Sequence, residues 1–159
     1  MPVVLFRVDD RLVHGQVIVG WGRPLAVERI ILVDDAVAAS PWEADLYRLA
    51  VPPSMVLEVV STADAGAHVR GWEADARRTI VVTGDIPSMQ ALRAAGHDVV
   101  REVNIGGLHL QPGRTERLPF VFLTDAEFLA LEAMAAEGVR VRAQDVPTAT
   151  AVGLSALGR

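Results

Sequence analysis

The sequence contains neither cysteine nor lysine. Without cysteine, the chain has no structural disulfide, no thiol nucleophile and no cysteine-based metal site. All 15 basic residues are arginines. A phosphate-binding loop of the G-x-x-x-x-G-K-[ST] type, a Schiff-base enzyme and a lysine general base each need an ammonium group. The two absences therefore exclude several large enzyme classes.

Long apolar runs are also missing, although hydrophobic residues make up 51% of the chain and the mean hydropathy is +0.31. Runs such as Ile30–Val33 and Ile80–Val82 have the length of a strand, so we expect no bilayer-spanning segment. The N-terminus has no basic region before its apolar residues and no small-residue cleavage site, which predicts a mature cytoplasmic chain. A net charge of −5 and a pI near 5.3 argue against nucleic acid as a partner.

The length of 159 residues suits a single domain covering residues 1–159. Short β-branched runs alternate with amphipathic segments, and this alternation predicts an α/β fold with a mostly parallel central sheet and helices on both faces. About seven strands are expected, at Val3–Arg7, Arg29–Val33, Met55–Val60, Thr79–Val82, Val99–Val103, Leu118–Phe122 and Val139–Gln144.

Two helix starts are marked by capping signals. Ser40-Pro-Trp-Glu43 offers an N-cap, a proline at the first helical position and a glutamate at the third, and Thr124-Asp-Ala-Glu127 repeats the capping box. Gly138 is placed to end the second helix. We interpret Trp21, Trp42 and Trp72 as packing residues.

His14 lies where the first apolar strand ends and a short helix is expected to begin. In an open α/β sheet, ligands bind at the carboxyl ends of the strands. A neutral imidazole can accept a phosphoryl group and release it again. Arg11 and Arg7 supply positive charge for the phosphoryl oxygens, Gly15 lets the backbone approach them, and Gln16 adds a neutral donor. The loop therefore favours phosphoryl chemistry.

An acidic pair precedes the histidine. Asp9 or Asp10 is placed to hold the second imidazole nitrogen and so fix the tautomer of His14. The alternative is a solvated ion pair between Asp10 and Arg11 beside an ordinary helix-start histidine. Spacing alone leaves both interpretations open.

A second acidic pair, Asp34-Asp35, follows the second strand and raises the possibility of a magnesium site like that of a response-regulator receiver. Such a site needs an aspartate where Ser61 and Thr62 stand and a lysine that the chain lacks. We expect Asp35 near the His14 loop or capping a turn. The four histidines lack metal-ligand spacing, so no metal is expected.

Glycines also follow the strand near residue 103. Asn104, Gly106 and Gly107 are interpreted either as a tight turn or as backbone able to approach an anion. They open the long irregular segment Gly106–Gly113, and long ordered loops are often functional.

The stretch Arg7-Val-Asp-Asp-Arg-Leu-Val-His-Gly-Gln-Val17 resembles the active-site loop of the IIB component of the mannose/fructose/sorbose family of the bacterial sugar phosphotransferase system. Three further segments resemble the same family in the same order. Ile30–Ala38 is similar to its second strand and turn, Val103–Leu108 to its Asn-[Val/Ile]-Gly-Gly segment, and Asp125–Pro147 to its last helix and strand. Asp34 departs from the smaller polar residue that the family often has there.

The resemblance implies a function for each matching residue. His14 is expected to take a phosphoryl group on Nδ1 from a phosphohistidine of the IIA protein. It would pass the group to a sugar of the mannose/fructose/sorbose class that enters through the IIC and IID membrane proteins. Arg11 would neutralise the phosphoryl oxygens, with Asp9 and Asp10 as the acidic pair of the loop. No cofactor or metal is implied, and the membrane is reached only through partners.

The resemblance also places the segment from Asn104 to Gly107 near the site. Because two partners must reach His14 in turn, we expect its side chain to be substantially exposed on a flat or convex rim. A second hypothesis keeps the same fold and the phosphorylation of His14, but makes the chain a regulatory or binding module that signals to another protein.

Overall fold

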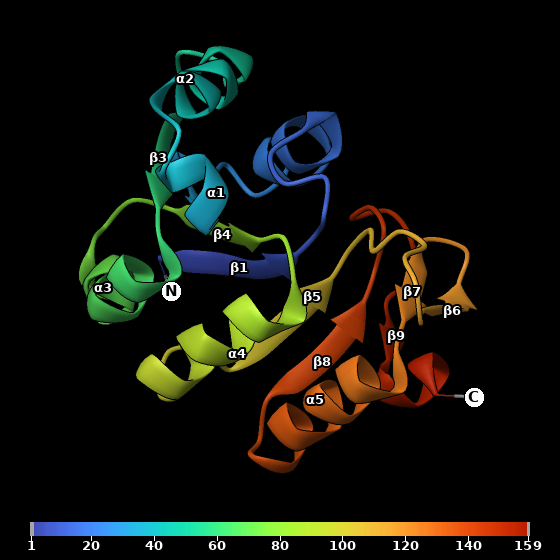
Figure 1. The fold of residues 1–159 in the computed structure, drawn as a ribbon. Coiled ribbons are helices and arrows are strands. Elements are labelled where there is room, and N and C mark those ends of the chain that lie inside the picture. Colours follow the sequence, from blue (N-terminus) through green and yellow to red (C-terminus); the bar gives the residue numbers. More distant parts are fainter. Residues whose placement is uncertain (1, 159) are drawn as a thin grey trace.

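The computed structural model describes residues 2–158, apart from the side chain of Gln16, and its centre is a seven-stranded sheet (Figure 1). Neighbouring strands are parallel, except that the last one runs antiparallel to its neighbour. Their order is β3 (Val56–Val60), β2 (Arg29–Val33), β4 (Thr79–Thr83), β1 (Val3–Val8), β5 (Glu102–Ile105), β8 (Arg140–Ala143) and β9 (Val152–Gly153). The predicted α/β fold with a mostly parallel sheet is confirmed.

Helices cover both faces of this sheet, as predicted (Figure 1). One face carries α3 (Thr62–Ala74), α4 (Ile86–Ala95) and α5 (Asp125–Ala136), and the other carries the π-helix η1 (Gln16–Gly22), α1 (Asp35–Ala38) and α2 (Pro41–Ala50). Side chains alternate along each strand, so Ile31 of β2 packs into one apolar cluster and Ile30 into the other. Two cores therefore lie on either side of one sheet.

The structure confirms the predicted capping signal of α5 in full and that of α2 (Pro41–Ala50) only in part. Thr124 forms the complete capping box with Glu127, and Gly138 follows α5 with a φ of +101°. Helix α2 begins at Pro41 as expected, but the side chain of Ser40 makes no capping hydrogen bond. The proline at the first helical position fixes that start because its φ is already helical.

The strand predicted over Leu118–Phe122 is wrong. Pro119 and Phe120 form a turn between β6 (Thr115–Leu118) and β7 (Val121–Leu123), and these two strands make a separate antiparallel sheet. Proline lacks the N–H that a central strand needs, so the apolar run folds back on itself. The seventh strand of the main sheet is β9, which was not predicted, and a 3₁₀ turn, η2 (Leu154–Leu157), follows it.

Within the described residues, no helix combines the length and the apolar character needed to cross a membrane.

The strand expected over Val99–Val103 begins later, at Glu102. Three strands of the sheet now place the candidate site, because β1, β4 and β5 are parallel neighbours and their carboxyl ends meet at one edge.

Candidate active site

The loop after β1 is fastened to the strands on both sides of it. The Asp9 N–H donates to the carbonyl of Thr83, the last residue of β4, at 2.9 Å, and the Asp10 N–H donates to the carbonyl of Gly107 after β5 at 2.8 Å. The chain then turns back, with the Leu12 N–H donating to the Asp9 carbonyl at 3.0 Å and Leu12 in the left-handed region at a φ of +60°. The loop thus carries His14 to the start of η1.

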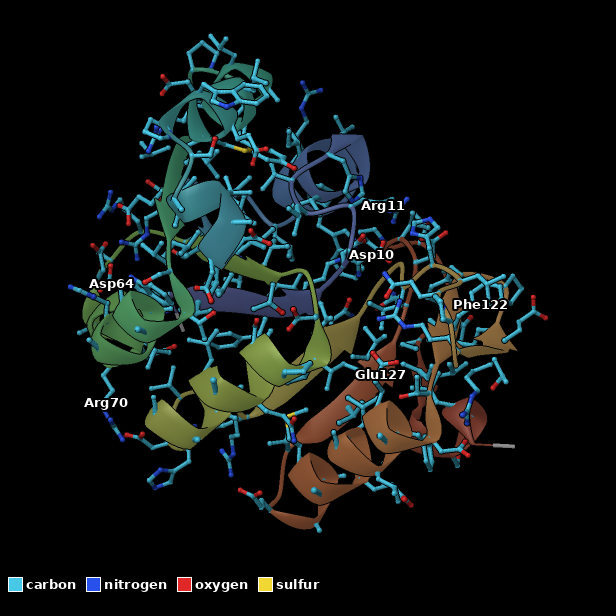
Figure 2. The ribbon with its side chains drawn as sticks, viewed as in Figure 1. Asp10, Arg11, Asp64, Arg70, Phe122 and Glu127 are labelled. Carbon is cyan, nitrogen blue, oxygen red and sulfur yellow. The ribbon has the colours of Figure 1, made fainter. Side chains whose placement is uncertain are left out.

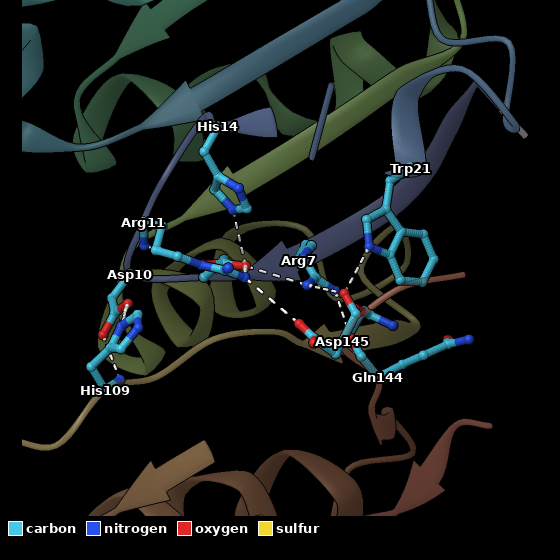
Figure 3. A network of polar contacts seen from close by, with 10 residues as sticks. Arg7, Asp10, Arg11, His14, Trp21, His109, Gln144 and Asp145 are labelled. Carbon is cyan, nitrogen blue, oxygen red and sulfur yellow. Dashed lines mark hydrogen bonds and ion pairs between the residues drawn. The ribbon is translucent and has the colours of Figure 1, made fainter. Parts of the chain in front are cut away.

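His14 faces the carboxylate of Asp9 (Figure 3). Its Nε2 atom lies 3.3 Å from Asp9 Oδ2, and the imidazole is 19% exposed. Our expectation of a substantially exposed histidine is therefore wrong, because the ring leans inward onto a buried carboxylate. When Nε2 carries the proton toward Asp9, Nδ1 keeps the lone pair.

Asp9 is fully buried and collects cationic donors. Arg11 donates to it from its backbone N–H at 3.1 Å, from Nε at 3.1 Å and from Nη2 at 3.0 Å, and Arg7 donates from Nη2 at 3.3 Å. Burial by itself raises the pKa of Asp9, but the hydrogen bonds from His14 and Arg11 and the charge of Arg7 outweigh it and hold the pKa below its ordinary value. The carboxylate stays ionised beside His14.

Arg7 was a candidate for contacting phosphate, and the structure places it beneath the loop instead. Its guanidinium is fully buried and donates to the Asn104 side chain, to the carbonyl of Gln144 at 2.9 Å and to that of Asp145 at 2.9 Å. It also lies 5.0 Å from the centre of the Trp21 ring. Burial lowers the pKa of Arg7, and the charge of Asp9 opposes that shift. These contacts indicate that Arg7 holds Asp9 in place.

Arg11 is the cation nearest to solvent in this network. Its side chain is 35% exposed, and Nη2 lies 3.8 Å from the Asp145 carboxylate. Hydrogen bonds to Asp9 raise the pKa of Arg11. Among the described residues, its Nη1 atom donates to none, which leaves one edge of the guanidinium toward solvent.

The glycines after β5 make room for these arginines. A Cβ on Gly106 would overlap the buried Arg7 guanidinium, and one on Gly107 would lie 3.0 Å from Arg11 Nε. Asn104 is buried and accepts from Arg7. The segment lies beside the His14 loop, and the pair of glycines is needed by the arginines that support it.

Asp10 turns away from His14 and holds a different histidine. Its carboxylate accepts from the backbone N–H of His109 at 2.7 Å and contacts His109 Nδ1 at 2.5 Å. Arg114, from the same loop, pairs with Glu127 through Nη2 at 2.9 Å and through Nε at 3.0 Å. Figure 2 shows Asp10 beside Arg11, with Glu127 further along the same side of the molecule. Asp10 therefore fixes the loop between β5 and β6.

The remaining predicted residues lie around this centre. Gly15 is exposed, with open space where a side chain would be, while the side chain of Gln16 is outside the described part of the chain. Asp35 accepts from the backbone N–H of Thr62, the first residue of α3, at 2.7 Å and so caps the start of that helix. Asp34 accepts from the N–H of Val37 and caps α1.

His68 lies on α3 between Asp64 and Arg70, which Figure 2 shows far from Asp10 and Arg11. Within residues 2–158, no group of three or more histidine, aspartate and glutamate side chains is placed to hold a metal ion.

Sequence reasoning did not single out Asp145 and assigned Trp21 to packing only. Trp21 is buried as predicted, but its Nε1 also donates to the carbonyl of Asp145 at 3.3 Å. A signal for Asp145 was present, because it follows the strand β8 and so reaches the edge where the other carboxyl ends meet.

A family model for the sorbose subfamily of IIB components of the phosphotransferase system matches residues 3–157. The chain belongs to this family. Its IIB components are sugar phosphotransferase proteins. The resemblance noted for the His14 loop and three further segments is thus confirmed at the level of the family.

The chain is 28% identical over 148 residues to the mannose-specific EIIAB component of Escherichia coli (strain K12), covering 93% of this chain and 46% of that protein. It thus spans about half the length of that relative. It is also 28% identical over 141 residues to the sorbose-specific EIIB component of Klebsiella pneumoniae, covering 89% of this chain and 85% of that one.

The crystal structure of the IIBSor domain of the sorbose permease from Klebsiella pneumoniae has a TM-score of 0.89 at 27% identity, covering 99% of this chain and 96% of that one. The same α/β architecture therefore occurs in this chain and in a solved IIB domain.

Proposed function

We propose that this chain is a phosphoryl carrier, which takes a phosphoryl group onto His14 from a phosphohistidine of a IIA protein and gives it to a sugar. The observation that carries the proposal is the contact between His14 Nε2 and the buried, ionised Asp9 at the carboxyl edge of the sheet. Family membership supports the same chemistry.

The first step is the attack of His14 Nδ1 on the phosphorus of the donor. Asp9 keeps the proton on Nε2, so the lone pair of Nδ1 forms the new P–N bond while the P–N bond of the donor breaks. The pair of electrons of the broken bond returns to the donor imidazole. As positive charge develops on His14, the Asp9 carboxylate stabilises it, as a carboxylate does for other catalytic histidines.

Arg11 is the cation that meets the phosphoryl oxygens in this proposal. Its exposed edge carries Nη1, while Nε and Nη2 hold it against Asp9. A guanidinium fixed in this way stabilises charge in the transition state without first having to reorganise. Arg7 and Asn104 act through Asp9, since Arg7 is fully buried.

In the second step, a sugar hydroxyl oxygen attacks the phosphorus, the P–N bond to His14 breaks, and the hydroxyl proton leaves with the restored imidazole or with solvent. We assign the sugar to the mannose/fructose/sorbose class and the membrane partners to IIC and IID, from the names of the family and of the relatives described above. The chain would then work in the cytoplasm and approach the membrane through these partners. Neutral imidazole is already a competent nucleophile, so the proposed transfer uses no metal or cofactor.

The test is to incubate the chain with ³²P-labelled IIA protein and to map the label. We expect it on His14, in an adduct that is labile in acid and stable in base, and unchanged by EDTA. His14→Gln should accept no label, while His109→Gln, the matched control, should be labelled normally. Label on His68, His97 or His109, or loss of transfer on chelation, contradicts the proposal.

A further inference from the structure

The outer face of α2 carries three large apolar side chains that no other part of the described chain covers. Trp42, Leu46 and Leu49 are all more than half exposed, with Leu49 reaching 82%. Their spacing of four and three residues puts them on one side of the helix. Trp42 was expected to be a packing residue, and that prediction is wrong because its side chain is 66% exposed. An apolar stripe of this kind marks a surface that another molecule covers.

This stripe continues to the proposed phosphorylation site. A hollow of about 510 Å³ is lined by His14, Val19 and Arg23 in and around η1, and by Leu49 and Pro52 at the end of α2 and just after it. Val19 is itself a large exposed apolar residue. Helix α2 and the coil of η1 lie next to each other on the same side of the sheet (Figure 1). The apolar stripe and His14 therefore belong to one continuous surface.

The hollow also carries positive charge. Arg23 lies in its wall, is exposed, and forms no ion pair with any described residue. A partner that fits this surface needs apolar side chains opposite α2 and a negative group opposite Arg23 and His14. A protein that presents a phosphohistidine amid apolar residues has this chemistry, because the phosphoryl group carries roughly two negative charges.

We propose that the phosphorylated IIA protein docks on this surface, formed by Val19, Arg23, Trp42, Leu46 and Leu49, and the proposal rests on the function proposed above. The partial burial of His14 favours this occupant. Since the imidazole is 19% exposed and faces the hollow, a donor histidine has to enter the hollow to reach Nδ1. The protein surface around that donor histidine then covers the walls of the hollow and the adjoining stripe.

The test compares the double variant Leu46→Gln/Leu49→Gln and the single variant Arg23→Gln with the wild type in transfer from phosphorylated IIA. Leu129→Gln is the matched control, because Leu129 is an exposed leucine of α5 on the opposite face of the sheet. We expect the KM for phosphorylated IIA to rise about tenfold or more in the double variant, with kcat within about twofold, because central apolar contacts dominate such interfaces. Arg23→Gln should raise KM by a smaller factor, and Leu129→Gln should leave it unchanged.

A second donor separates docking from chemistry. Phosphoramidate is a small phosphoryl donor that needs no apolar docking surface, so the double variant and the Leu129→Gln control should be labelled on His14 at the wild-type rate. Labelling of His14 with an unchanged KM for IIA would overturn the docking proposal and leave the proposed function intact. Absence of label on His14 from either donor would overturn the proposed function itself.

Two other molecules that could cover the stripe would give different results in these measurements. If the double variant keeps its KM for IIA but loses binding to membrane vesicles containing IIC and IID, the stripe serves the membrane proteins and the proposal is wrong. If it changes only the sedimentation coefficient of the chain, the stripe is a contact between copies, and the proposal is again wrong.

Discussion

Replacing Asp9 by asparagine tests the central contact of the site. The side chain keeps its shape but loses its charge, and its amide N–H₂ can donate to His14 Nε2, which then holds the lone pair while Nδ1 carries the proton. A nucleophile protonated on the attacking nitrogen cannot form the P–N bond. The same exchange beside another catalytic histidine lowers kcat by about 10⁴, and since Asp9 also has Arg11 as a partner, we expect a loss of about 10² to 10⁴ in the transfer rate.

The same change also lowers stability, because Asp9 neutralises the fully buried Arg7. Breaking a buried ion pair costs about 3–5 kcal/mol. The amide oxygen still accepts from one arginine, so we expect the free energy of unfolding to fall by about 3 kcal/mol. Domains of this kind have about 5–15 kcal/mol in total, so the variant should remain folded at 25 °C.

Asp10→Asn is the matched control, since it makes the same chemical change one residue along. Asp10 contacts His109 and no atom of His14, so we expect transfer within about threefold of the wild type. Single-turnover transfer from phosphorylated IIA and urea unfolding measure the two quantities. A normal rate in Asp9→Asn, or an equal loss in both variants, would refute the assignment of Asp9 to the tautomer of His14.

Arg11→Ala should slow transfer by about 10² to 10³, because its guanidinium acts on transition-state charge. It should also lower the free energy of unfolding by about 1.5–3 kcal/mol, since the buried Asp9 loses two side-chain hydrogen bonds but keeps those from Arg7 and His14. Normal transfer with unchanged IIA binding would remove Arg11 from the mechanism. Gly106→Ala should cost about 1–3 kcal/mol in urea unfolding because its Cβ meets the Arg7 guanidinium, whereas Gly71→Ala, in open space on α3, should not destabilise. Because the pKa of Asp9 in the folded chain lies below its unfolded value of about 3.9, its contribution to stability is complete above about pH 5 and is lost as the pH falls. Between about pH 5 and pH 3, urea titrations should therefore show a steeper loss for the wild type than for Asp9→Asn, and parallel curves would contradict the ionised Asp9.

The fold class was predictable because its determinants are local. Alternating strand-length and helix-length patterns fix a parallel sheet, and the capping box at Thr124 with Gly138 fixes α5. The failure at Leu118–Phe122 has a local cause as well. Pro119 stands inside the apolar run, and a proline there argues against a central strand.

The sequence by itself determined that His14, an acidic pair and two arginines leave the first strand together at the edge where parallel strands end. The sequence could not show which of these residues contacts His14, which lies at the surface and which supports the loop from below. Asp9 and Asp10 are adjacent and chemically identical, yet the direction in which each points depends on β4, β5 and the loop at His109. The direction of each side chain is therefore set by contacts with residues that are distant in the sequence.

Tertiary structure also decided which arginine is buried. Arg7 and Arg11 look alike in the loop, but Asn104, Gln144 and Asp145 surround the guanidinium of Arg7, and they come from segments 97 to 138 residues away in the chain. The exposure of Trp42 is of the same kind, because helical spacing tells which side chains share a face but not whether another element covers that face. Local sequence thus fixed the elements and the chemistry available at the site. Long-range packing fixed which groups became buried supports and which were left to meet a partner, because burial depends on neighbours that are distant in the sequence.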